Sequence, residues 1–388
     1  MEVLLLNSSF GDNFNSEIQP FQIHVSQDIL DDLQNRLAKT RWPDQAENAG
    51  WRMGSNLDYL KDFVEYWQYQ YDWRKNEEEL NAYNHFTTEI EGTKLHFIHE
   101  PSSNPDAIPI LLIHGWPDSF YRYHKVILVL KENFHVVVPS IPGTGFSERN
   151  SLPFDQIADL FATLMTAKLG YTQFISAGGD MGSIVSLSLA NRHPEALLGM
   201  HLTDVGYPDH NTDFASLTPP EQEFAAFIQG WWMKEGAFNM IQSTKPQSLS
   251  YGFNDSPVGL AAWIMGSITM SSTGEEIEER FSRDELLTNI MIYWVTETIG
   301  SSMRIYYAES QAAHSKESYG KSEVPAGVAH CPWDAPLPKE WAARKTNLIH
   351  FSDLEKGGHY TAWEAPEVWV KDFRDFVQRL TSMQVRIY

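Results

Sequence analysis

The sequence predicts an α/β fold in which helices cover both faces of a mostly parallel sheet. Apolar stretches of strand length alternate with helical stretches from Lys94 to about residue 210, which is typical of parallel sheets. One of these strands leads through an abrupt, glycine-rich turn directly into a helix. A helical and aromatic block then interrupts the alternation from Pro219 to about Ala313, before a further strand and helix complete it.

A leading segment, residues 1–105, precedes the alternating part and extends the fold at its N-terminal side. Its first helix is expected from Ser26, a capping residue, to Leu37. Its second helix is expected from Leu57 to Tyr71, because the apolar residues there fall on one helical face.

The alternating elements define the rest of the chain. We expect residues 106–215 to form the first part of the core, 216–324 a helical lid, and 325–388 the second part of the core. The expected strands are 94–99, 108–113, 135–139, 174–178, 200–203 and 347–351. Four helices are expected in the core: one that starts near Ser119, one at 157–169, one from Met181 to His193, and one at 366–380.

The glycine-rich turn after Phe174–Gly178 is the most informative part of the sequence. Gly178 and Gly182 stand two residues before and two residues after Asp180, where only a small residue fits in a sharp strand-to-helix elbow. In the α/β-hydrolase fold this position carries the nucleophile, which is usually Ser. The sequence therefore predicts an α/β-hydrolase fold with an aspartate nucleophile. The alternative is that Asp180 only caps the helix.

A carboxylate nucleophile restricts the chemistry. A serine that attacked an sp³ carbon would form an ether, which water does not readily cleave. A carboxylate forms an ester, and water can attack its carbonyl carbon and restore the aspartate. Asp180 therefore suits the opening of epoxides or the displacement of halide from carbon.

Such a nucleophile needs a base, an acid that orients the base, and N–H donors for an oxyanion. The base is expected to be His359, which follows the last strand in a loop with two glycines. For the acid we favour Asp334 and keep Asp204 as the alternative, because each stands in a loop after a strand. The expected oxyanion donors are the backbone N–H groups of Met181 and Trp116.

Composition excludes several other classes. The chain has 29 Lys+Arg against 51 Asp+Glu and a net charge of −22, which disfavours nucleic acid and anionic membranes as partners. Cys331 is the only cysteine, and we expect neither a disulfide nor a metal or other cofactor. The apolar run Val3–Leu6 is too short for a signal peptide or membrane anchor, so we expect a cytoplasmic protein. A homo-oligomer is left open.

These residues resemble the microsomal-type epoxide hydrolases over nearly the whole chain. The motifs that carry the resemblance are His114-Gly115-Trp116-Pro117, Gly178-Gly179-Asp180, Asn254 to Ala262, Leu286 to Asn289 and Gly357-Gly358-His359, with Tyr71-Asp72-Trp73-Arg74 in the leading segment. The resemblance implies a mechanism through Asp180 and His359, with Asp334 as the orienting acid.

The resemblance also implies a lid with two tyrosines that protonate the epoxide oxygen. Tyr306 matches one of them, but Phe238 stands at the substrate-binding position of the other. We therefore expect Tyr306 to act alone, or with a nearby hydroxyl such as that of Tyr307 or Tyr251. Met181 is a second departure, since the family often has Trp there.

The predicted function is an epoxide hydrolase that forms a vicinal diol from an apolar or aromatic epoxide. The nearest alternative is a haloalkane dehalogenase, but Met181 beside the nucleophile lacks the side-chain N–H donor that halide release needs. A specialised hydrolase or cyclase is a further alternative because of Phe238. A dinucleotide-binding domain is disfavoured by the glycine spacing, and a non-catalytic binding protein by the presence of Asp180, His359 and Tyr306 together.

Overall fold

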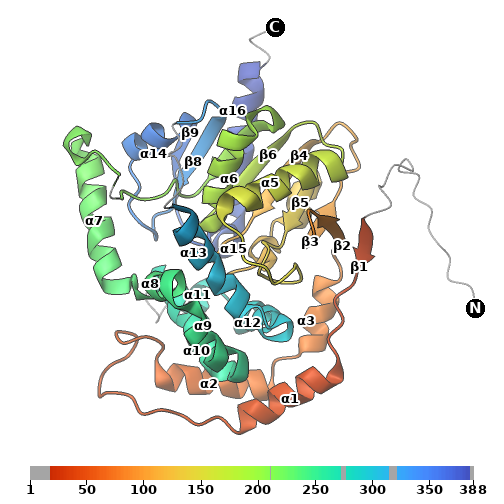
Figure 1. Ribbon diagram of the computed structural model, residues 1–388, viewed down its shortest axis with the longest axis vertical. Helices are drawn as coiled ribbons and strands as arrows, with labels where there is room; N and C mark the ends of the chain where they lie inside the picture. Colours follow the sequence, from red (N-terminus) through yellow and green to blue (C-terminus); the bar gives the residue numbers. More distant parts are fainter. Residues whose placement is uncertain (1–17, 210, 272–276, 314–320, 385–388) are drawn as a thin grey trace, which may run out of the picture.

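The computed structural model of the protein describes residues 18–209, 211–271, 277–313 and 321–384. Within these residues, nine strands form one sheet in the order β1-β2-β3-β5-β4-β6-β7-β8-β9 (Figure 1). The pairs from β5 through β9 are parallel, and β1, β2 and β3 extend one edge in antiparallel pairing. The expected α/β-hydrolase fold with a mostly parallel sheet is thus confirmed. The strands are β1 (Gln19–Phe21), β2 (His85–Ile90), β3 (Thr93–Glu100), β4 (Ile108–Ile113), β5 (Phe134–Pro139), β6 (Phe174–Gly178), β7 (Leu197–Leu202), β8 (Pro325–His330) and β9 (Asn347–Asp353).

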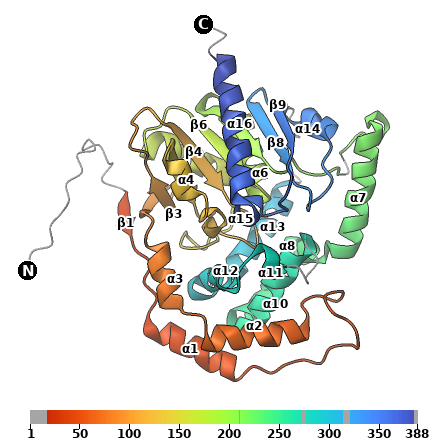
Figure 2. The same cartoon turned by 180° about the vertical axis from the view of Figure 1, so that it is seen from behind.

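Helices cover both faces of this sheet. One face carries α5 (Phe154–Thr163) and α6 (Met181–Arg192), and the other carries α4 (Ile127–Lys131) and α16 (Pro366–Gln384), as the two opposite views show (Figures 1 and 2). The short helices α14 (Lys339–Lys345) and α15 (Thr361–Glu364) flank β9 in the sequence. The central strands are enclosed by these layers, and the side chains of β4 from Ile110 onward are 0% exposed.

The insertion between β7 and β8 is helical, as expected from the sequence. Within it α13 packs against α8 and α9, and α10 packs against α9 and α12. Its helices are α7 (Pro219–Glu235), α8 (Ala237–Thr244), α9 (Pro246–Asp255), α10 (Pro257–Ile268), α11 (Ile277–Arg280), α12 (Arg283–Thr296) and α13 (Ile299–Ala313), with 3-10 turns η4 (Phe214–Ser216) and η5 (Thr269–Ser271).

The leading segment lies against this helical insertion rather than against the sheet alone (Figure 1). It contains α1 (Gln27–Ala38), α2 (Leu57–Tyr69) and α3 (Trp73–Leu80). The Tyr66 hydroxyl donates to Asp284 at 2.7 Å, and the Thr288 hydroxyl donates to Asn76 at 3.0 Å, so α12 is bonded to both α2 and α3. The boundaries at 105, 215 and 324 stay predictions.

The helices expected near Ser119 and at 157–169 differ from expectation. Near Ser119 the chain forms only the 3-10 turn η1 (Phe120–Tyr123), and the α-helix begins at Ile127. The reason is local, because the Asp118 side chain bonds back to the Gly115 N–H and holds the chain in a compact loop. The expected helix at 157–169 begins earlier, at Phe154, and its last turn is the π-helix η2 (Leu164–Lys168).

Candidate active site

Asp180 stands at the sharp elbow between β6 and α6, with φ of +56° and ψ of −132°. Few non-glycine residues adopt a positive φ, and such strain is typical of functional turns. A Cβ on Gly178 would overlap the backbone of Gly182, and a Cβ on Gly182 would overlap the carbonyl of Ile113. The two glycines are therefore required by the close approach of β4, β6 and α6.

The two carboxylate oxygens of Asp180 have different partners. Oδ1 accepts a hydrogen bond from the Trp116 N–H at 2.9 Å, and the Met181 N–H also bonds to this carboxylate. Oδ2 lies 3.1 Å from Nε2 of His359. Burial opposes ionisation, but His359 and the two backbone donors lower the pKa of Asp180. These contacts favour the ionised carboxylate, with Oδ1 held by the Trp116 N–H and Oδ2 facing the imidazole.

His359 lies between two carboxylates. Its Nδ1 is 2.9 Å from Oδ2 of Asp334, which follows β8, and its Nε2 faces Asp180. Burial by itself would lower the pKa of His359, but Asp334 and Asp180 together raise it well above its ordinary value. The two carboxylates therefore favour the protonated, imidazolium form of His359.

Asp204, the alternative acid, has another contact. Its Oδ2 accepts the Asp180 N–H at 2.8 Å, and its Oδ1 accepts the Gly206 N–H at 3.3 Å. Burial raises the pKa of Asp204 to about 6, with nearby Asp180 and Asp334 adding to the shift and His359 opposing it. Asp204 therefore supports the elbow from below, and Asp334 is the carboxylate bonded to the histidine.

A cavity of about 2350 Å³ opens above Asp180 and extends toward the leading segment. Near the elbow its wall is aromatic. Phe238 stacks on Trp116 at 5.8 Å between ring centroids, and Tyr306 meets both rings edge-on, at 6.1 and 5.9 Å. Burial and the charge of Asp180 raise the pKa of Tyr306 well above its ordinary value, so its hydroxyl keeps its proton.

The structure brings together all of the expected site residues: Asp180, His359, Asp334, Tyr306, Trp116, Met181 and Phe238 all lie at this end of the cavity or in direct contact with it. It does not place the two auxiliary hydroxyls there. Tyr307 and Tyr251 are 43% and 71% exposed and do not line the cavity. Sequence reasoning missed Tyr207 and Tyr360, which do line it. Tyr360 directly follows the predicted base, and that adjacency could have pointed to it.

Two further observations concern binding and location. Among the residues that the structure describes, no three His, Cys, Asp or Glu side chains are grouped so that they could hold a metal ion. In the same part of the chain, no helix has both the length and the apolar character needed to cross a bilayer.

Comparison with known proteins agrees with this geometry. Residues 18–123 match the family described as epoxide hydrolase N terminus, and residues 108–242 match the alpha/beta hydrolase fold. Epoxide hydrolase 1 of Sus scrofa is 36% identical over 94% of this chain and 89% of its own length. Among solved structures, juvenile hormone epoxide hydrolase from Bombyx mori superposes with a TM-score of 0.83 at 29% identity, covering 95% of this chain and 96% of that one. The Aspergillus niger epoxide hydrolase superposes with a TM-score of 0.81 at 30% identity, covering 95% and 99%.

Proposed function

This chain belongs to the epoxide hydrolase family of α/β-hydrolases, and we propose that it opens its epoxide through a covalent ester on Asp180. Water activated by His359 then hydrolyses the ester and releases a vicinal diol. The single observation that supports this mechanism most is that the two oxygens of the Asp180 carboxylate have different partners. Oδ1 is held by the Trp116 N–H at 2.9 Å, which leaves Oδ2 to attack carbon.

In the first step, Oδ2 of Asp180 forms a bond to an epoxide carbon as the carbon–oxygen bond of the ring breaks. Negative charge develops on the epoxide oxygen, and Tyr306 is the cavity hydroxyl that we assign to protonate it. His359 carries the mobile proton of the resting site, as its raised pKa indicates. The opened oxygen takes the Tyr306 proton, the His359 proton then restores the Tyr306 hydroxyl, and His359 is left neutral.

The second step follows from the loss of charge on Asp180. Asp180 is one of the two carboxylates that raise the pKa of His359. Once Asp180 is an uncharged ester, the pKa of His359 falls, and the neutral imidazole can act as a base. Water loses a proton to Nε2 and attacks Cγ of Asp180. The Trp116 and Met181 N–H groups stabilise the resulting oxyanion. Asp334 stabilises the imidazolium, which then gives its proton to the leaving alkoxide. The carboxylic acid left on Asp180 transfers its proton to Nε2 of His359, which restores the resting carboxylate and imidazolium.

The cavity supports a bulky apolar or aromatic epoxide as the substrate. Trp231, Trp232 and Trp263 line it in addition to Phe238 and Trp116. Aromatic walls of this kind bind apolar ligands mainly by burial of apolar surface. A cytoplasmic location and the oligomeric state stay predictions.

A haloalkane dehalogenase is the less favoured function. Halide needs N–H donors beside the nucleophile, and the Met181 side chain has none. The indole N–H of Trp116 is occupied, since it donates to the Ser302 hydroxyl at 3.2 Å. We expect no halide release from chloro- or bromoalkanes, as measured by ion chromatography. Halide release faster than epoxide turnover would reverse the assignment.

Tyr306→Phe is expected to lower epoxide turnover by roughly 10²–10³, the usual effect of losing one well-placed donor. Phe238 has no hydroxyl to share the task. Phe238→Tyr should raise turnover of simple epoxides by adding a second donor, provided its hydroxyl fits between the Trp116 and Trp232 rings, which stack on Phe238 at 5.8 and 6.3 Å. Initial rates with an epoxide panel measure both effects.

The matched control is Tyr307→Phe. Tyr307 is the next residue on α13, is 43% exposed and does not line the cavity, so its loss should leave turnover unchanged. If Tyr306→Phe were equally silent and Phe238→Tyr had no effect, protonation by the lid would be wrong. A specialised hydrolase or cyclase would then be the better assignment.

A further inference from the structure

A buried ion pair lies directly beneath the candidate active site. The Arg122 and Asp118 side chains are 2% and 0% exposed, and Nη1 of Arg122 donates to Oδ2 of Asp118 at 2.5 Å. Burying two charges is costly, and an apolar pair would often be no less stable. Stability alone is therefore a weak explanation for this ion pair. The other contacts of Asp118 and Arg122 indicate its role more clearly.

Asp118 binds the loop that supplies an oxyanion donor. Its Oδ1 accepts the Gly115 N–H at 2.8 Å, and the next residue, Trp116, donates its N–H to Asp180. The lid holds the same loop from above, because the Tyr293 hydroxyl donates to the Asp118 carbonyl at 2.7 Å. The direction of the Trp116 N–H therefore depends on the Asp118 side chain.

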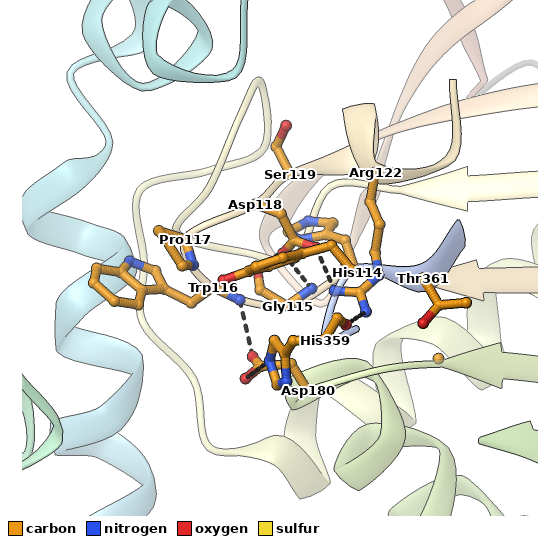
Figure 3. Close-up of polar contacts among 12 residues, drawn as sticks. His114, Gly115, Trp116, Pro117, Asp118, Ser119, Arg122, Asp180, His359 and Thr361 are labelled. Carbon is orange, nitrogen blue, oxygen red and sulfur yellow. Dashed lines mark hydrogen bonds and ion pairs between the residues drawn. The ribbon is translucent and has the colours of Figure 1, made fainter. Parts of the chain in front are cut away.

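Arg122 binds the loop that carries the base. Its Nη2 donates to the backbone carbonyl of His359 at 2.5 Å, and the guanidinium lies 5.4 Å from the ring centre of Tyr360. A Cβ on Gly179 would overlap Nη2, so the guanidinium also packs against the peptide that precedes Asp180. Figure 3 shows the unbroken series of contacts from Gly115 through Asp118 and Arg122 to His359.

We propose that Arg122 and Asp118 are positioning residues that fix the places of the Trp116 N–H donor and the His359 base on either side of Asp180. This inference rests on the proposed roles of His359 and Trp116. The planar guanidinium suits the task, since its two Nη atoms bond to different loops at fixed angles. A lysine ammonium is a point charge and cannot reproduce that fork.

The two half-reactions should depend on this pair to different extents. Alkylation needs only the Asp180 carboxylate and a proton donor, and the Met181 N–H remains on α6 to hold the carboxylate. Hydrolysis needs His359 within reach of a water at Cγ, and the Arg122 bond fixes the backbone of that residue. A misplacement of about 1 Å costs on the order of 10²-fold in rate. Loss of the pair should therefore slow hydrolysis far more than alkylation.

The test uses Arg122→Lys and the double variant Asp118→Asn/Arg122→Met, which leaves no unpaired charge in the core. Single-turnover rapid quench with mass spectrometry of the Asp180 ester measures formation and decay separately. In both variants we expect ester decay to slow by about 10²-fold or more and ester formation by less than tenfold. The ester should accumulate in the steady state, with kcat lowered and KM lowered alongside it.

Arg344→Met is the matched control, because Arg344 pairs with the buried Glu221 at 2.6 Å away from the cavity. It should lower the melting temperature and leave both rates unchanged. The proposal is overturned if Arg122→Lys, folded by circular dichroism, keeps the wild-type ratio of the two rates. An equal loss in both rates also overturns it, because that result indicates general destabilisation. Failure of the covalent mechanism is distinguishable, since no ester would then form in any variant.

Discussion

His359→Gln is expected to convert the enzyme into a protein that alkylates itself once and then stops. Alkylation uses Oδ2 of Asp180, whereas ester hydrolysis needs a base, and Gln cannot accept a proton from water. Steady-state turnover should fall by roughly 10⁴ or more, the range seen when a triad group is removed. Intact-protein mass spectrometry should show the mass of one substrate added, and peptide mapping should place it on Asp180.

The control is the double variant Asp180→Ala/His359→Gln, which has no nucleophile and should stay unmodified. It separates alkylation of Asp180 from adventitious reaction at other carboxylates, of which an acidic chain has many. A His359→Gln protein that stays unmodified, beside a wild-type enzyme that turns over, would rule out the covalent mechanism. Water would then have to attack the epoxide directly.

Much of the fold could be predicted because the central strands carry their own signal. The apolar run of β4 (Ile108–Ile113) and the elbow after β6 (Phe174–Gly178) require no knowledge of the rest of the chain. By contrast β2 (His85–Ile90) was missed, because four of its six residues are polar and its strand character comes from pairing with β3. β1 has only three residues and depends on β2 in the same way.

The site shows a similar division. The glycine-flanked elbow pointed to Asp180 and the glycine-containing loop after the last strand pointed to His359, in the chain order that the fold requires. Charged residues that end up buried could not be recognised as such. Asp118 and Arg122 are four residues apart, and in a sequence they look like a solvent-exposed ion pair on a helix. Asp118 and Arg122 lie beneath the elbow only because the segments that follow β4, β6 and β9 meet there in the folded protein.

The sequence favoured Asp334 as the acid but left Asp204 open, for a related reason. Both follow parallel strands, β8 and β7, which are neighbours in the sheet and end at the same edge. Which of the two carboxylates reaches Nδ1 of His359 depends on the paths of the two loops. Asp334 reaches it at 2.9 Å, while Asp204 binds the Asp180 N–H instead.

Asp334→Asn should therefore nearly abolish turnover, by about 10⁴, because the analogous loss of an orienting carboxylate leaves the histidine in the wrong tautomer and its cation unsupported. Asp204→Asn is the matched variant, with the same change of one carboxylate to an amide. Its side-chain oxygen can still accept the Asp180 N–H, so we expect it to lose less than about tenfold.

The pH dependence sharpens this comparison. Because the pKa of Asp204 is raised to about 6, its carboxyl is neutral below that pH, and Asp204→Asn should then match the wild type. Above it, the variant lacks one negative charge near His359, so its imidazolium is less stable and kcat departs modestly from the wild type. Asp334→Asn should be inactive over the whole range, since the pKa of Asp334 is lowered and its carboxylate is charged throughout. The reverse pattern, with Asp204→Asn inactive and Asp334→Asn active, would assign the orienting role to Asp204 and leave the covalent step unchanged.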